Sequence, residues 1–390
     1  MFRRKLWLVL VAALTVAAVA AGIAFAEKDK GNDKNFEYAI GLWGDFPYSD
    51  VQAQVGVPNL IDDMNDADIK FSVQDGDLKA GSATANSQTP TTCADPLYVQ
   101  ALGFFNSLEK PAFFTPGDND WTDCDRLSNG PFDSLERLTH ERTVFFSGKY
   151  ADRSLGQEQM KAEVQTAPLC QGAPSSPGDP RPLVGCIENR LWTFEKITYV
   201  TLNVQGTCNN LCKSGSAADP SVGDANGDPA EYQARNAADM EWLQEAFDEA
   251  DAKKSAGLMI IWQADPGFDT SGYQGTPKRD PLSLIQTDVP ANQDGYHDIL
   301  VELRNLTIGF KKPVVLVHGD SHYFRVDKPL VNAQGRRLEN FTRVETFGDN
   351  QANGINDVHW VKALVDPNSR DVFAFQAQIV PGNRVAVPAP

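Results

Sequence analysis

Five short apolar segments of this chain are each followed directly by a polar turn, and this recurrence constrains the fold more than any other feature. Apolar segments of this length, bounded by glycine and proline, are typical of buried β-strands. The turns carry aspartate, asparagine, glutamine or histidine, often beside a glycine that lets the backbone reverse sharply. The five expected strands span residues 38–43, 69–73, 112–115, 258–262 and 314–317, and their turns read GDFPY, QDGD, PGDND, QADP and HGDSH.

Helical patterns alternate with these strands. Apolar residues recur at helical spacing over residues 96–108, 229–252 and 294–310, which predicts three helices with one buried face each. Strands alternating with helices favour an α/β fold, in which helices cover sheets. Further strands are expected at residues 198–204, 360–365 and 372–379.

The N-terminal segment, residues 1–26, has the features of a secretory signal peptide. Three basic residues precede an apolar stretch, which ends in the small-residue sequence Ala24-Phe25-Ala26. An uncleaved membrane anchor is the alternative, because about 20 apolar residues can span a bilayer. We expect residues 27–390 to form a single domain, because no linker rich in Gly, Ser and Pro divides them. Polar stretches near residues 80–94, 171–182 and 214–229 are expected to be loop insertions.

The chain is strongly acidic. Its formal net charge is −17, and loss of the three basic residues of the signal segment makes it −20. Binding to duplex nucleic acid depends largely on Lys and Arg contacts to phosphates, so no nucleic acid duplex is expected as a partner. The expected location is secreted, periplasmic or cell-surface, with membrane contact only if the N-terminal segment stays uncleaved.

Six cysteines lie in the exported part, an even number that predicts three disulfides in an oxidising compartment. Six cysteines allow 15 pairings, and the sequence alone does not choose among them. Proximity along the chain favours Cys208 with Cys212, Cys170 with Cys186, and Cys93 with Cys124.

The polar turns are expected to meet in space, because the carboxyl ends of strands in an α/β sheet border one crevice. Oxygen and imidazole donors are the ligands of hard and borderline divalent cations. Several carboxylates packed together repel one another unless they hold protons or a cation neutralises them. A Gly-Asp pair on its own merely forms a turn, whereas five such turns together favour a metal site.

In order and position, the turns resemble the motifs of the calcineurin-like metallophosphoesterase family: DxH, GDxx, GNH[DE], an isolated His, and GHxH. The resemblance extends from Gly44 to about Pro329. It implies a four-layer α/β/β/α sandwich and an exported, metal-dependent phosphoesterase that hydrolyses small phosphate mono- or diesters through a metal-activated water. The implied metal ligands are Asp45, Asp77, Asp118, Asn119, Gln263, Asp320 and His322, with either Asp118 or Asn119 as the amide-type ligand position.

The resemblance implies two divalent ions bridged by Asp77, and the sequence leaves Mn, Fe, Zn, Mg and Ca open. Pro47, Asn119, Gln263 and Asp320 stand where the family has histidines. Replacing imidazole by oxygen donors shifts the metal preference toward manganese, magnesium or calcium. The alternative function is therefore a metal-stabilised binding protein without turnover.

Catalysis would also need a proton donor for the leaving group and a cation near the phosphate. His318 and Asp120 are the candidate donors, and Arg325 is the candidate for offsetting phosphate charge. The aromatic residues beside the turns either fill the core or wall the site; they are Tyr48, Trp121, Trp262 and Tyr323. The chain contains no GxSxG, P-loop or GxGxxG motif, which argues against serine hydrolase, P-loop and Rossmann chemistry.

Overall fold

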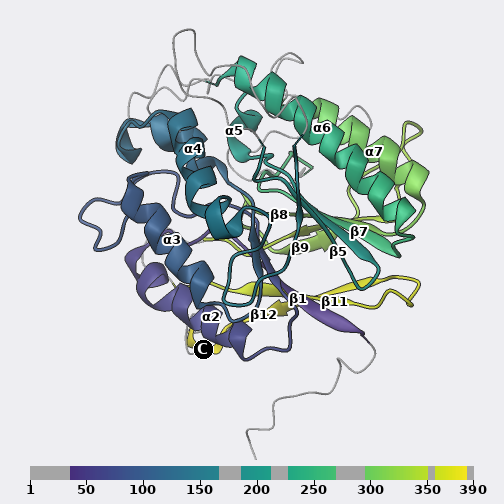
Figure 1. The fold of residues 1–390 in the computed structure, drawn as a ribbon, viewed down its shortest axis with the longest axis horizontal. Coiled ribbons are helices and arrows are strands. Elements are labelled where there is room, and N and C mark those ends of the chain that lie inside the picture. The colour runs from purple at the N-terminus through teal and green to yellow at the C-terminus, as the bar shows by residue number, and fades with distance from the viewer. Residues whose placement is uncertain (1–35, 167–185, 212–226, 269–294, 350–355, 384–390) are drawn as a thin grey trace, which may run out of the picture. The chain divides into compact units, whose positions relative to one another are not determined.

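The computed structural model describes residues 36–166, 186–211, 227–268, 295–349 and 356–383 (Figure 1). These residues form two mixed β-sheets with helices packed against them, which confirms the predicted α/β class. The expected signal peptide, the insertion at 171–182 and most of the insertion at 214–229 lie outside the described residues.

The first sheet has the strand order β12-β11-β1-β2-β3. Strands β1, β2 and β3 run parallel, and β11 pairs antiparallel with both β1 and β12. The three parallel strands therefore end at the same edge of the sheet. The strands are β1 (Tyr38–Trp43), β2 (Ser72–Gln74), β3 (Ala112–Phe114), β11 (Trp360–Val365) and β12 (Phe373–Gln378).

The second sheet has the order β4-β5-β6-β7-β8-β10-β9. Its middle strands β6, β7, β8 and β10 run parallel to one another, whereas β4 pairs antiparallel with β5, β5 with β6, and β9 with β10. The strands are β4 (Glu163–Val164), β5 (Arg190–Phe194), β6 (Ile197–Thr201), β7 (Gly257–Ile261), β8 (Val314–His318), β9 (Arg325–Asp327) and β10 (Phe341–Glu345).

The two sheets share one hydrophobic core. Ile40 and Leu42 of β1 belong to the same buried cluster as Met259 and Ile261 of β7 and Val317 of β8. Alternate residues of a strand face the same side, so one face of each sheet supplies this core. Aromatic rings join the sheets as well: the ring centroids of Phe113 in β3 and Trp192 in β5 are 3.7 Å apart.

Helices cover the other face of each sheet (Figure 1). Helices α6 (Pro229–Ala252) and α7 (His297–Phe310) contribute Trp242, Leu243 and Leu300 to a second core, which includes Ile260 and Leu316 of the larger sheet. Helices α3 (Asp95–Ser107) and α4 (Ser134–Phe145) lie against the smaller sheet, as does α2 (Val57–Asn65). The ring of Phe105 in α3 lies 5.6 Å from Trp43 and 5.4 Å from Phe114.

The long elements agree with the sequence prediction to within a few residues. The predicted helix at 294–310 begins at His297, and the predicted strand at 69–73 is assigned as Ser72–Gln74. The backbone before Ser72 still bonds to β1, through Lys70 N–H to Ala39 O and Gly41 N–H to Phe71 O. Short helical turns complete the described chain; they are Gln52–Gly56, Asp118–Asp120, Thr122–Asp125, Leu127–Asn129, Gly148–Tyr150, α5 (Gly206–Asn209) and Pro381–Asn383.

The described cysteines test part of the predicted disulfide set. Cys93 and Cys124 are bonded, as predicted, and Cys208 is also disulfide-bonded. Cys186 is buried, and Cys170 and Cys212 lie outside the described residues. None of the described helices combines the length and apolar composition that crossing a bilayer requires.

The predicted insertion at 80–94 is described, and it contains no helix or strand. Asp50, which precedes the turn Gln52–Gly56, anchors this loop. Its carboxylate accepts hydrogen bonds from the backbone N–H groups of Gln88 at 2.8 Å and Thr89 at 3.2 Å, and from the hydroxyl of Thr89 at 2.7 Å. The loop is therefore held beside the segment that follows β1.

Candidate metal centre

The structure brings the sequence-predicted turns together at the carboxyl ends of the parallel strands. Asp45 follows β1, Asp77 follows β2, and Asp320 and His322 follow β8. The backbone N–H of Asp320 donates to Asp45 Oδ1 at 2.9 Å, which links the edges of the two sheets. Gly319 permits this approach, because a Cβ at its position would lie 1.7 Å from Asp45 Oδ2.

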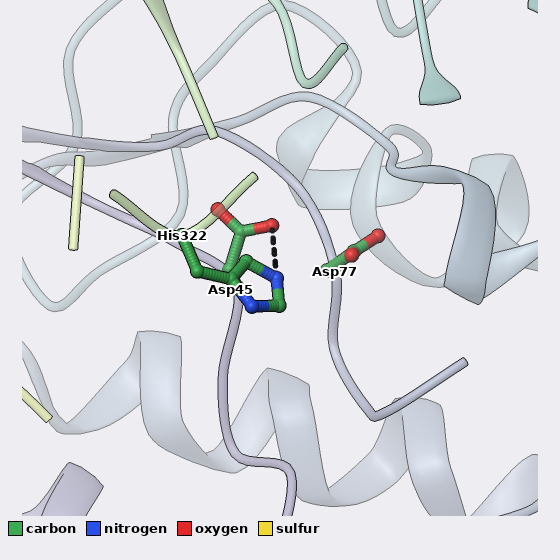
Figure 2. Close-up of side chains that lie close together, drawn as sticks. All are labelled: Asp45, Asp77 and His322. Atoms are coloured by element: carbon green, nitrogen blue, oxygen red, sulfur yellow. Dashed lines mark ion pairs between the residues drawn. The ribbon is translucent and has the colours of Figure 1, made fainter. Parts of the chain in front are cut away.

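Asp45, Asp77 and His322 form a close group of potential metal ligands among the described residues. One ligand atom from each lies within 4.8 Å of the others, and all three side chains are buried. Figure 2 shows the three side chains close together, with His322 Nε2 3.6 Å from Asp45 Oδ1. His322 Nδ1 lies 2.8 Å from the carbonyl oxygen of Asp349, so this nitrogen donates to the backbone and Nε2 is the ring nitrogen that faces the carboxylates. Metal-binding histidines are commonly oriented in this way.

Tyr48 contributes a hydroxyl to this group. The Tyr48 hydroxyl donates to Asp77 Oδ2 at 2.5 Å and lies 3.3 Å from His322 Nε2. It also accepts a hydrogen bond from Asn119 Nδ2 at 3.1 Å. The sequence presented Tyr48 only as a core or wall aromatic, although its position three residues after Asp45 placed it on the turn.

Asp118, Asn119 and Gln263 form the adjoining side of the centre. Asn119 Nδ2 donates to Asp77 Oδ2 at 2.7 Å, and Gln263 Nε2 donates to Asp118 Oδ1 at 3.1 Å. Asp118 Oδ2 accepts from the hydroxyl of Thr207 at 2.7 Å. The sequence did not single out Thr207, which lies in α5 after β6.

The turn around Thr207 has an unusual backbone. Thr207, Cys208, Asn209 and Asn210 have φ angles of 47°, 55°, 54° and 64°. L-residues adopt this left-handed region singly and at a cost, rarely in succession. Arg235 of α6 fixes the turn by donating to Asn209 Oδ1 at 2.6 Å and to Asn209 O at 2.9 Å. The turn therefore depends on contacts made by its neighbours.

Four of the predicted ligand residues also have positive φ angles. The values are 57° for Asp45, 61° for Asp77, 71° for Asp320 and 62° for His322. Asp, Asn and His tolerate this conformation better than other side chains, but it remains uncommon for them. Strained backbone of this kind concentrates at functional sites, where the surrounding structure enforces it.

The buried carboxylates make the metal-free centre electrostatically unfavourable. Burial, followed by the charges of Asp118 and Asp45, raises the pKa of Asp77 well above its ordinary value. Burial and the charge of Asp118 do the same to the pKa of Asp320. Burial alone would lower the pKa of His322, but the adjacent Asp45 carboxylate raises it. In the absence of a cation, the centre therefore favours bound protons.

These residues fit a divalent cation by their donor chemistry. Among the described residues, Asp45 Oδ2 is buried without a hydrogen-bond partner, which is costly for a carboxylate oxygen. A cation held by Asp45, Asp77 and His322 would offset the charge of these buried carboxylates and take the place of the protons that burial favours. Carboxylate oxygens with one imidazole suit hard to borderline ions.

The candidate proton donors lie in less suitable surroundings. His318 is fully buried, and burial lowers its pKa to about 4; its Nδ1 donates to Gly319 O at 2.9 Å. Asp120 Oδ2 accepts backbone hydrogen bonds from Gly117 at 2.9 Å and Asp77 at 3.1 Å, and its Oδ1 accepts one from Leu78 at 2.5 Å. Asp120 therefore ties the turn after β3, which contains it, to the turn after β2, which contains Asp77.

Arg325 lies at the start of β9 and pairs with two buried carboxylates. Its Nε lies 2.5 Å from Glu345 Oε2, and its second guanidinium nitrogen lies 3.2 Å from Asp265 Oδ2. Part of its charge is thus already balanced by the protein. Among the aromatic candidates, Trp121 and Trp262 are fully buried and belong to the core, whereas Tyr323 is 63% exposed beside His322.

Comparison with known proteins gives no match to a family model and none to a curated protein. Among solved structures, the chain is similar to GAP50, the anchor in the inner membrane complex of Plasmodium, with 10% identity, a TM-score of 0.40, and 88% of each chain covered. It is similar to a 5'-nucleotidase from Candida albicans, with 9% identity, a TM-score of 0.42, and coverage of 87% of this chain and 50% of that one. It is also similar to the phosphopantetheinyl hydrolase PptH from Mycobacterium tuberculosis, with 12% identity, a TM-score of 0.34, and coverage of 80% and 90%.

Proposed function

We propose that this chain is an exported, metal-dependent phosphoric ester hydrolase, built as a four-layer α/β/β/α sandwich of the calcineurin-like metallophosphoesterase type. The observation that supports this function is the convergence of Asp45, Asp77 and His322 within 4.8 Å. These residues come from three strand-end turns that are far apart in sequence. The turns follow one another along the chain in the order of that family's motifs.

Asp45, Asp77 and His322 would hold the metal, with Asp118, Asn119, Gln263 and Asp320 as the polar groups around them. A divalent ion held here supplies Lewis acidity toward a phosphoryl oxygen and makes water more acidic. The chain itself contributes orientation, because the Tyr48 hydroxyl and the Asn119 amide fix the Asp77 carboxylate. The substrate class is a small phosphate monoester or diester.

An extracytoplasmic location agrees with the disulfides of Cys93, Cys124 and Cys208, since disulfides persist mainly in oxidising compartments. The acidic surface disfavours polyanionic partners such as duplex nucleic acid. The roles of His318, Asp120 and Arg325 in proton transfer and charge compensation remain predictions.

A metal-stabilised binding protein without turnover is the second candidate. The hydrogen bonds of Asp120 and the ion pairs of Arg325 favour it, because both groups are engaged by the protein itself. An enzyme of this kind would need another proton donor near the centre. Bound metal without hydrolysis of monoesters, diesters and nucleotides would distinguish the binding protein from the enzyme.

Asp77→Asn is expected to abolish metal-dependent hydrolysis of an activated phosphodiester. The amide removes one negative charge from the group that holds the ion, and even residues that only support metal ligands cost 10–100-fold when mutated. We therefore expect a loss of at least about 100-fold in kcat/KM with added Mn²⁺, together with loss of bound metal. The assay compares initial rates and metal content of both proteins.

Asp68→Asn is the matched control, because the Asp68 side chain is 94% exposed. It makes the same chemical change away from the centre and should retain the wild-type rate. Equal hydrolysis by wild-type and Asp77→Asn proteins would contradict the proposed enzyme.

A further inference from the structure

We propose that the centre holds one divalent ion, bound by Asp45, Asp77 and His322, and that amide groups of the chain itself occupy the place of a second ion. This inference rests on the metal site of the proposed function. It departs from the sequence resemblance, which implies two ions. The difference lies in the orientation of two side-chain amides, those of Gln263 and Asn119.

The orientation of Gln263 is fixed by the backbone. The N–H of Gly206 donates to Gln263 Oε1 at 2.5 Å, so the oxygen of this amide is already engaged. The NH₂ group must then face Asp118 Oδ1, 3.1 Å away. An amide nitrogen has no lone pair available to bind a metal. The hydrogens of this amide face Asp118 Oδ1, where a second cation would otherwise bind. Reversing the amide would set its NH₂ against the Gly206 donor and leave two buried polar groups unsatisfied.

The stem of Gln263 has little room to move. A Cβ at Gly76 would lie 2.4 Å from Gln263 Cγ and 2.6 Å from its Cβ, so the Gly76 backbone packs directly against this side chain. Gln263 is also completely buried. Packing and hydrogen bonding therefore keep the same end of the amide toward Asp118.

Asn119 limits the number of ions that Asp77 can bind. Asp77 Oδ1 accepts from the backbone N–H of Asn119 at 3.2 Å, and Oδ2 accepts from Asn119 Nδ2 at 2.7 Å and from the Tyr48 hydroxyl at 2.5 Å. A carboxylate offers about four lone-pair positions. These three donors leave about one of them, which can serve one ion but cannot bridge two.

Both carboxylate oxygens of Asp118 accept hydrogen bonds from the chain itself. One of its oxygens accepts from Gln263 and the other from the Thr207 hydroxyl at 2.7 Å. The nearby Asp320 Oδ2 accepts from the backbone N–H of Asp265 at 3.0 Å. By contrast, Asp45 Oδ2 is buried and has no hydrogen-bond partner in the part of the chain that the structure describes. This buried carboxylate oxygen without a donor thus belongs to one of the three residues proposed to hold the single ion.

The test is the metal stoichiometry of the wild-type chain, measured without reference to turnover. Protein equilibrated with excess Mn²⁺ and freed of unbound ion is expected to contain one Mn²⁺ per chain by elemental analysis and by calorimetric titration. Its electron paramagnetic resonance spectrum should show an isolated Mn²⁺ ion. Two ions per chain, or the spectrum of an exchange-coupled pair, would overturn the inference.

Gln263→His tests the blocking group directly. An imidazole at this position offers a nitrogen lone pair toward Asp118 in place of an NH₂, so the variant is expected to bind a second Mn²⁺. Gln244→His makes the same change on the surface of α6, where the Gln244 amide donates to Asp248 Oδ1 at 3.0 Å, and should stay at one ion. A Gln263→His protein that also stays at one ion would contradict the role given to Gln263.

The outcomes also separate this inference from the proposed function. One ion per wild-type chain without phosphoester hydrolysis supports the single-ion centre and contradicts the enzyme. Hydrolysis with two ions per chain supports the enzyme and contradicts the single-ion centre. A wild-type chain that binds no ion contradicts both.

Discussion

Without divalent metal, the stability of this protein is expected to fall as the pH rises from about 4 to about 8. Burial raises the pKa of Asp120 from 3.8 to about 7 and that of Asp239 to about 8. Burial likewise raises the pKa values of Asp75, Asp77 and Asp320. The folded protein therefore holds these protons more tightly than the unfolded chain does.

The sign follows from proton linkage. A carboxyl group whose pKa is raised by folding stabilises the folded protein fully below its unfolded pKa, near 4, and that stability is lost as the pH rises through the folded pKa. Each proton held only by the folded state contributes at most about 1.4 kcal/mol per pH unit. Asp50, whose pKa is lowered to about 2, titrates below this range. His318, whose pKa is lowered from 6.5 to about 4, opposes the trend between those two values, but it is outnumbered by the carboxyl groups with raised pKa values.

Bound metal is expected to remove or reverse this fall of stability with rising pH. A cation replaces the protons in the centre, so it binds more tightly as the pH rises and the carboxylates ionise. At a free concentration 1,000 times its Kd, a ligand specific for the folded state adds about 4.1 kcal/mol. Urea unfolding at pH 5, 6, 7 and 8, with EDTA or with Mn²⁺, measures both slopes.

The Asp77→Asn protein is the control for this measurement, because it should show little stabilisation by Mn²⁺ at any pH. Parallel pH profiles of the wild-type protein with EDTA and with Mn²⁺ would show that the buried carboxylates do not bind the ion.

Gly117→Ala is expected to cost about 3 kcal/mol or more of stability, at the upper end for overpacked sites. A Cβ at Gly117 would lie 2.1 Å from Asp77 Oδ1 and 2.4 Å from the Asp77 backbone nitrogen. The φ angle of Gly117 is −105°, which alanine can adopt, so the clash and not backbone strain sets the cost. Because the nearest atoms include backbone, the turn carrying Asp77 must shift, and metal affinity should fall as well.

Gly103→Ala is the control, because the same substitution at this position is expected to increase stability. Gly103 lies within α3, and a Cβ there meets nothing within 4 Å. Alanine in an open helical position stabilises by about 0.5–1 kcal/mol relative to glycine. Denaturant midpoints and bound Mn²⁺ of the two variants measure both effects. A Gly117→Ala protein that keeps wild-type stability and metal content would contradict the close packing described around Asp77.

The sequence predicted the convergence of the turns because that convergence follows from topology. Parallel strands end at one edge of a sheet, so recognising β1, β2, β3, β7 and β8 was enough to bring Asp45, Asp77, Asp118, Gln263 and Asp320 into one neighbourhood. The apolar runs also revealed the strands, since both faces of each parallel strand are covered.

The orientation of side chains within that neighbourhood could not be predicted in the same way. The direction of the Gln263 amide depends on the N–H of Gly206, and the pairing of Arg325 depends on Glu345. These contacts join residues from different elements and leave no local pattern in the sequence. Sequence motifs therefore gave the residue types of the centre but not which of their atoms face inward.

The left-handed turn at Thr207–Asn210 is a part of the centre whose backbone conformation needs contacts from the rest of the protein. In isolation, this stretch would relax to ordinary right-handed or extended backbone, because each of its residues is of higher energy as it stands. Arg235 opposes that relaxation by binding Asn209, and the Thr207 hydroxyl reaches Asp118 only while the turn persists. Loss of the Arg235 contacts on helix α6 would thus remove one of the two side-chain hydrogen bonds that Asp118 accepts.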